Sequence, residues 1–140
     1  MTMNADRFPY GIAGDARDPA HALPYLPIVL EHGNSHVHAH GLIDSGSTLN
    51  VLPYHLGLQL GATWAQQTIS VPLTGNLSDS EARALLVWGT IGSFPRVRLA
   101  FAWSRNERVP LILGQANFFV EYEVCFFGAR GAFEVRATSA

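Results

Sequence analysis

Short runs in which apolar and polar residues alternate fill most of the chain from residue 25 onward. Alternation with a period of two is typical of a strand that buries one face. The clearest run is 96–103, where the apolar face would carry Val97, Leu99, Phe101 and Trp103. Further strands are expected at 25–31, 36–43, 82–89, 120–126 and 132–136, with turn-forming residues between them. The pattern predicts an all-β fold.

Four details refine this pattern. Pro27 lacks the N–H that a central strand would donate, which confines 25–31 to a sheet edge or to the start of a strand.

Residues 54–61 allow a short helical turn despite two glycines. Residues 78–81 match a helix capping box, yet the residues after them also alternate, and there we expect a strand. The last two runs form a hairpin, with Val120, Tyr122, Val124 and Phe126 sharing a face of the first strand and Phe133 and Val135 turned inward from the second.

The composition indicates a folded domain without a nucleic-acid partner. The chain has 140 residues, 48% of them hydrophobic, which is enough for a core that offsets the entropy of ordering the backbone. Its net charge is −2 and it contains no basic run, so it lacks the electrostatic signature of nucleic-acid binding. Cys125 is the only cysteine, and no disulfide can form within the chain.

The same composition bears on location and domain limits. No apolar stretch reaches the roughly 18 residues that cross a bilayer, and the first residues lack the apolar block of a signal peptide. We therefore expect a soluble, cytoplasmic protein without a membrane partner. Proline and glycine are frequent in residues 1–24, which favours an irregular arm, so we place the domain at 25–140.

The segment 40–53, HGLIDSGSTLNVLP, carries the most specific pattern in the chain. Asp44 follows an apolar pair and precedes Ser45, Gly46, Ser47 and Thr48. Glycine admits backbone conformations closed to other residues and adds no bulk beside the carboxylate. The three hydroxyls are able to donate hydrogen bonds to it. An aspartate that only caps a turn is the alternative for this loop.

A second segment, 109–119, lies much further along the chain. Val109–Leu113 is apolar and ends at Gly114, after which Gln115–Phe119 allows one turn of helix. Alone, it also fits an ordinary core strand followed by a turn. Together and in this order, the two segments resemble the retropepsin-like (retroviral-type) aspartic protease family. The family's two motifs, hydrophobic-hydrophobic-Asp-Thr/Ser-Gly-Ala/Ser and apolar-apolar-Gly, are matched by Leu42-Ile43-Asp44-Ser45-Gly46-Ser47 and Ile112-Leu113-Gly114.

The resemblance covers roughly residues 25–136 and implies a small closed β-barrel with one short helix and a β-hairpin flap. It implies that Asp44 is catalytic and that two such carboxylates share one proton and activate water against a peptide bond. Because the chain has one such aspartate, the resemblance implies a homodimer that acts on a peptide or protein substrate without a cofactor. The alternative is a catalytically inactive retropepsin-like domain that dimerises or binds peptides.

Roles for the neighbours of Asp44 also follow from the resemblance. Ser45 would lock the two loops across the dimer axis, and Gly46 would give the carboxylate clearance. A hydroxyl on Ser47 would donate to the ionised carboxylate and favour its charged form, from which we predict an acidic pH optimum. The second motif, Ile112, Leu113 and Gly114, would support the loop.

The resemblance places the flap at residues 73–79, with Thr74, Gly75 and Asn76 at its turn. This segment has one glycine and no tyrosine at its tip, which departs from the family's usual glycine-rich flap.

Three other patterns in the chain suggest chemistry of a different kind. His36, His38 and His40 would share one face of a strand about 6.6 Å apart, a spacing at which histidines can share zinc. Since no further ligand is evident, we assign them to a polar outer face and expect no metal. Ser45 lacks the Gly-x-Ser-x-Gly context of a hydrolase nucleophile, because Ile43 stands at the first glycine. Cys125 is expected to be a small packing residue.

Overall fold

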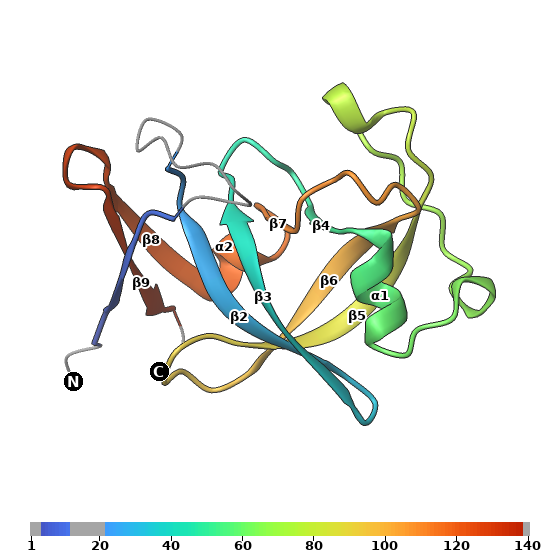
Figure 1. Cartoon of the computed structure of the whole chain (residues 1–140), viewed down its shortest axis with the longest axis horizontal. Helices are drawn as coiled ribbons and strands as arrows, with labels where there is room; N and C mark the ends of the chain where they lie inside the picture. The colour runs from blue at the N-terminus through green and yellow to red at the C-terminus, as the bar shows by residue number, and fades with distance from the viewer. Residues whose placement is uncertain (1–3, 12–21, 139–140) are drawn as a thin grey trace.

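A closed β-barrel forms the centre of the structure, a computed structural model that describes residues 4–11 and 22–138 (Figure 1). Around the barrel the strands follow the order β2-β3-β7-β4-β6-β5. Their bounds are Tyr25–His32 (β2), Ser35–Ile43 (β3), Asn50–Leu52 (β4), Ala82–Thr90 (β5), Val97–Ser104 (β6) and Ile112–Leu113 (β7). The all-β, closed-barrel expectation is confirmed, including the strand rather than a helix at β5.

The short strand β7 lies between β3 and β4, which follow one another in the chain. It runs parallel to β3, where Leu42 faces Ile112, and antiparallel to β4, where Val51 faces Ile112. Residues 44–49 connect β3 to β4. Inserting a later strand between two consecutive ones therefore brings the second apolar motif against the loop that carries Asp44.

Alternating side chains build the core as expected for β6, where Leu99, Phe101 and Trp103 are buried. Ala102 on the opposite face of β6 is buried as well. It belongs to a second apolar cluster, in which Leu73 from the segment before β5 packs with Val51, Ala82, Val109 and Ile112. The barrel wall beside β4 and β7 is thus covered on its outer side, which the alternation alone did not indicate.

Two short α-helices occur in the described residues, one at or near each helical turn expected from the sequence, whereas the resemblance implied one. α1 (Tyr54–Gln59) confirms the helical turn, and Gly57 allows it to pack flush on Trp103, because a Cβ at position 57 would lie 2.1 Å from the Trp103 ring. α2 (Phe118–Glu121) begins three residues later than the predicted turn at 115–119. Val120 consequently lies in α2 and is 65% exposed, so its predicted place on a strand is wrong.

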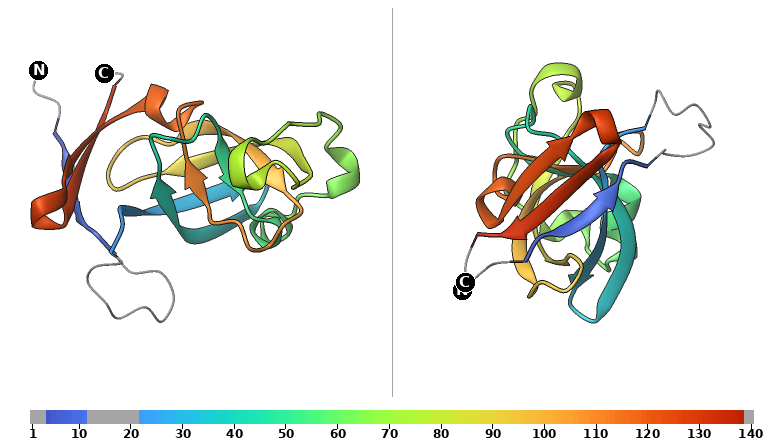
Figure 2. Two further views of the ribbon diagram at one scale, coloured as in Figure 1. Left: turned by 90° about the horizontal axis from the view of Figure 1, so that it is seen from above. Right: turned by 90° about the vertical axis from the view of Figure 1, so that its left-hand side faces the viewer.

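A smaller sheet, in the order β1-β9-β8, packs beside the barrel (Figure 2). Its strands are β1 (Asp6–Pro9), β8 (Tyr122–Phe127) and β9 (Ala132–Ala137), and β8 and β9 form the predicted hairpin. Phe133 and Val135 are fully buried, as expected, whereas Phe126 on β8 is exposed.

The expectation of an irregular arm is wrong for Asp6–Pro9, which pairs with β9 and stacks Phe8 on Phe133. Pro9 ends an edge strand, where its missing N–H costs no ladder bond. Residues 1–3 and 12–21 of the arm lie outside the described part of the chain. No helix among the described residues is long and apolar enough to cross a membrane.

Candidate active site

The Asp44 loop leaves the end of β3 and is fixed at its first residue. The backbone N–H of Asp44 donates to the carbonyl of Leu113, at 3.0 Å, which continues the parallel pairing of β3 with β7. Asp44 itself is partly buried, while Ser45 and Gly46 at the tip are exposed. The loop is therefore anchored at Asp44 and exposed to solvent at Ser45 and Gly46.

A side chain at position 46 would crowd the Asp44 carboxylate. The Gly46 N–H donates to Asp44 Oδ1 at 2.9 Å, and a Cβ at position 46 would lie 3.2 Å from the same oxygen. Gly46 is not among the described glycines with positive φ, so the predicted need for an unusual backbone conformation is wrong. The Ser47 N–H donates to the Asp44 carbonyl at 3.1 Å and closes the turn.

Ser47 does not donate to the carboxylate. Its hydroxyl donates to the Leu49 carbonyl, at 2.7 Å, and so stabilises the backbone further along the loop. The acidic pH optimum was inferred from a Ser47 donor at Asp44 and loses that physical basis. Within residues 4–11 and 22–138, the hydrogen bond to the Asp44 carboxylate comes from the Gly46 backbone.

The second motif lies directly against this loop. A Cβ on Gly114 would lie 2.3 Å from the Leu49 carbonyl oxygen and 2.7 Å from that of Ser47, so glycine alone fits between them. Beyond it, the backbone N–H groups of Gln115 and Ala116 donate to the carbonyls of Ser47 and Thr48, both at 2.9 Å. Ile112 and Leu113 before it are buried. The structure thus brings both predicted motifs together through their backbones.

Two asparagines that the sequence reasoning missed extend this contact. Asn50, at the start of β4, is 0% exposed, and its Oδ1 accepts the Gly114 N–H at 2.8 Å. Its Nδ2 donates to the Ala100 carbonyl and to Asn117 Oδ1, each at 3.1 Å. A buried amide with all its bonding groups used stabilises one arrangement of the strands around it. The available signal was one polar residue inside the apolar run at 49–52.

Gln115 was also missed as a site residue. Its side-chain Nε2 donates to the carbonyl of Ser45 at 2.8 Å, so this residue contacts the loop through both its backbone and its side chain. The sequence pattern at position 115 indicates only the start of a helical turn.

The predicted flap residues lie on a loop that projects beside the barrel (Figure 1). Its two stems pair antiparallel, with the Ala84 N–H donating to the Ile69 carbonyl and the Val71 N–H to that of Ala82. The tip is the 3₁₀ turn η3 (Gly75–Leu77), where Gly75 has a φ of 63°. Leu73 anchors the loop in the second apolar cluster. The segment is therefore an irregular hairpin with a compact tip.

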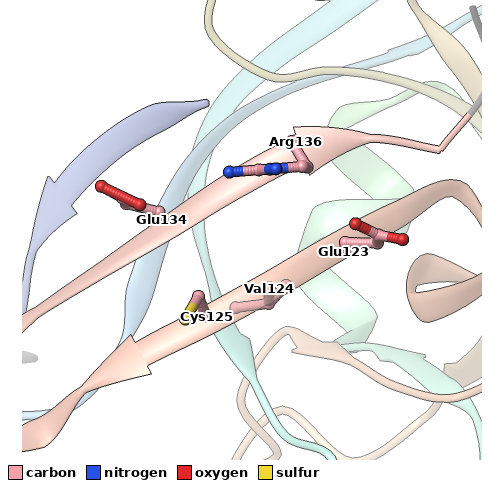
Figure 3. Close-up of a pocket in the computed structure, with 5 residues that line it drawn as sticks. All are labelled: Glu123, Val124, Cys125, Glu134 and Arg136. Carbon is pink, nitrogen blue, oxygen red and sulfur yellow. The ribbon is translucent and has the colours of Figure 1, made fainter. Parts of the chain in front are cut away.

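The other sequence candidates lie away from this loop. His36, His38 and His40 are exposed on the outer face of β3, as expected, and the described residues contain no group of three or more metal-binding side chains. Cys125 is exposed, so its assignment as a packing residue is wrong. It lines a pocket on the small sheet with Glu123, Val124, Glu134 and Arg136 (Figure 3). That pocket is built from β8 and β9 alone and is separate from Asp44.

Comparison with solved structures places the fold. The chain is similar to a retropepsin-like aspartic protease from Rickettsia conorii, with a TM-score of 0.63 and 14% sequence identity over 97% of this chain and 94% of that chain. No model of a known family and no curated protein matches the sequence. The chain therefore has a retropepsin-like aspartic protease fold, and its activity is argued from the site.

Proposed function

We propose that the protein is an aspartic endopeptidase whose active site is completed by two copies of Asp44 in a homodimer. The observation that carries the proposal is the Asp44 loop itself: a carboxylate bonded to the Gly46 N–H, on a loop backed by the Gly114 segment. Such backing limits the positions that the carboxylate can take. Fixed geometry is what a catalytic group needs.

The chemistry requires a second carboxylate. Two facing carboxyl groups share one proton because both ionise only at high cost when close together. The ionised group takes a proton from water, and the protonated one polarises the peptide carbonyl. Among the described residues Asp44 has no ion-pair partner, and Ser45 and Gly46 leave the loop tip open. A two-fold axis at this tip would bring two identical loops together.

The loop carrying Thr74, Gly75 and Asn76 is proposed as the flap over a bound peptide. Its stems are held to each other by backbone hydrogen bonds. At its base, Leu73 packs in one apolar cluster with Val51 of β4 and Ile112 of β7, and both strands lie next to the Asp44 loop. A loop that is anchored at its base and projects beside the barrel is suited to closing over a substrate.

Asp44→Asn tests the proposal because it removes the ionisable group and keeps the shape of the side chain. With an unstructured protein such as labelled casein as substrate, we expect cleavage to fall by at least about 100-fold. The control Glu107→Gln removes one exposed negative charge elsewhere and should cleave like the wild type. Circular dichroism should show that both variants remain folded.

Two results would overturn the assignment. Equal cleavage by the wild type and Asp44→Asn would remove Asp44 from the mechanism. A wild-type protein that binds casein peptides or dimerises without cutting them would favour the inactive dimerisation or peptide-binding domain instead.

A further inference from the structure

Gln115 holds the Asp44 loop at two points on either side of Gly46. Its backbone N–H donates to the Ser47 carbonyl at 2.9 Å, and its side-chain Nε2 donates to the Ser45 carbonyl at 2.8 Å. The backbone bond fixes where the side chain starts. The side-chain bond therefore restrains a carbonyl at the exposed tip that the backbone N–H groups of Gln115 and Ala116 do not contact.

The side-chain bond reaches Asp44 through a single peptide group. The Ser45 carbonyl that Gln115 contacts and the Gly46 N–H that contacts Asp44 Oδ1 belong to the same peptide unit. The three groups form a continuous chain from the Gln115 amide through this peptide to the Asp44 carboxylate. Only the NH₂ end of the glutamine side chain can take this place, since a carbonyl accepts and does not donate.

This series of hydrogen bonds affects both the strength and the direction of the bond to Asp44. A donor at the carbonyl oxygen polarises a peptide and strengthens the hydrogen bond that its N–H makes. The same donor also fixes the plane of the peptide, and thereby the direction from which the Gly46 N–H meets Asp44. Because Gln115 is exposed, this restraint is separable from the buried packing of the barrel.

We propose that Gln115 is a positioning residue for Asp44, which it orients and stabilises through the Ser45–Gly46 peptide. This inference rests on the proposed protease function for its effect on turnover, but the hydrogen-bonded chain itself does not. In this role Gln115 contacts neither the attacking water nor the peptide substrate, so its loss should lower kcat and leave KM for the peptide unchanged.

Gln115→Met tests the effect on turnover because methionine has a similar length and no donor. We expect kcat to fall about fivefold to tenfold, the loss of one ordinary hydrogen bond, at unchanged KM. The matched control is Gln59→Met, which changes an exposed glutamine at the end of α1. It should retain wild-type kcat and KM.

A second measurement follows the chain without using activity. We expect Gln115→Met to raise the solvent-exchange rate of the Gly46 amide, measured by NMR, by more than that of the Ser47 amide, which donates to the Asp44 backbone carbonyl. In an Asp44→Ala background the Gly46 amide has lost its acceptor, and adding Gln115→Met should change its exchange little.

The two measurements separate the possible failures. If the wild type does not cleave peptides but Gly46 exchange responds in an Asp44-dependent way, the protease proposal fails and the Gln115 chain stands. If the wild type cleaves and Gln115→Met leaves both kcat and Gly46 exchange unchanged, the positioning role is overturned. An equal rise at Gly46 and Ser47, unaltered by Asp44→Ala, would also overturn it by showing general loosening of the loop.

Discussion

Tyr122 is the side chain whose ionisation the fold changes most clearly. It is 1% exposed at the start of β8, packed on Phe118 and Phe94, and no described residue forms a hydrogen bond with its hydroxyl. Burial, and secondarily the negative charge of Glu121, raises the pKa of Tyr122 from 10.0 to about 12. The folded protein thus holds the phenolic proton more tightly than the unfolded chain.

The raised pKa of Tyr122 determines the direction of a pH effect on stability. Its contribution is fully present below pH 10 and is lost as the pH rises toward 12, because the unfolded chain releases the proton first. We expect Tyr122→Phe to be more stable than the wild type by about 1 kcal/mol at neutral pH, since it removes a buried hydroxyl without a partner. Above pH 10 that advantage should grow.

Urea unfolding at pH 7, 10 and 11 would measure both effects. The control is Tyr25→Phe, at a partly exposed tyrosine on β2, which should follow the wild-type pH profile. A constant difference between Tyr122→Phe and the wild type across this range would contradict the assignment.

The residues of the Asp44 loop differ in how far the sequence revealed them. The motif placed Asp44, Gly46 and Gly114 in one site, and the structure brings them together. It could not show that the Ser47 hydroxyl turns to Leu49, because a serine has several acceptors within reach and local geometry selects among them. Nor could it single out Gln115, whose role depends on a contact between segments far apart in the chain.

At the scale of elements, alternation predicted most strands because the longer strands bury mainly one face. It failed at 120–126, where the first two residues belong to α2 and the strand begins at Tyr122. It also failed to place β7, since a strand of two residues has too few positions for a period to appear. The insertion of β7 between β3 and β4, which assembles the site, is a property of topology that no local pattern encodes.

The β8–β9 turn offers a test of how a tight connection is stabilised. Gly128 begins η4 (Gly128–Arg130) and Gly131 follows it, and a Cβ at either position would have no heavy atom within 4 Å. Of these two glycines, Gly131 alone has a positive φ, of 60°. We expect Gly131→Ala to lower the free energy of unfolding by about 1 kcal/mol, the cost of a left-handed conformation for an L-residue.

Gly128→Ala is the matched control and should change the free energy of unfolding by less than about 0.5 kcal/mol. Thermal or urea unfolding of the two variants beside the wild type would measure the difference. Equal stabilities would mean that the turn relaxes and that its backbone conformation does not restrict residue 131.

For the whole molecule, the central consequence of the proposed mechanism is that one chain carries half of an active site. The Asp44 loop is hydrogen-bonded to residues 113–116 of the same chain, and its tip is exposed to solvent. In a two-fold assembly each site takes one Asp44 from each chain, so a chain with Asp44→Asn would inactivate the site of any partner it joins. Activity should then depend on pairs of intact chains.

Mixing wild type with Asp44→Asn at constant total concentration, with subunit exchange complete, measures this dependence directly. The proposed mechanism requires cleavage to follow the square of the wild-type fraction, so an equal mixture should retain about a quarter of the wild-type activity. A linear decline, with about half the activity in the equal mixture, would mean that each chain acts alone and would contradict a shared Asp44 site.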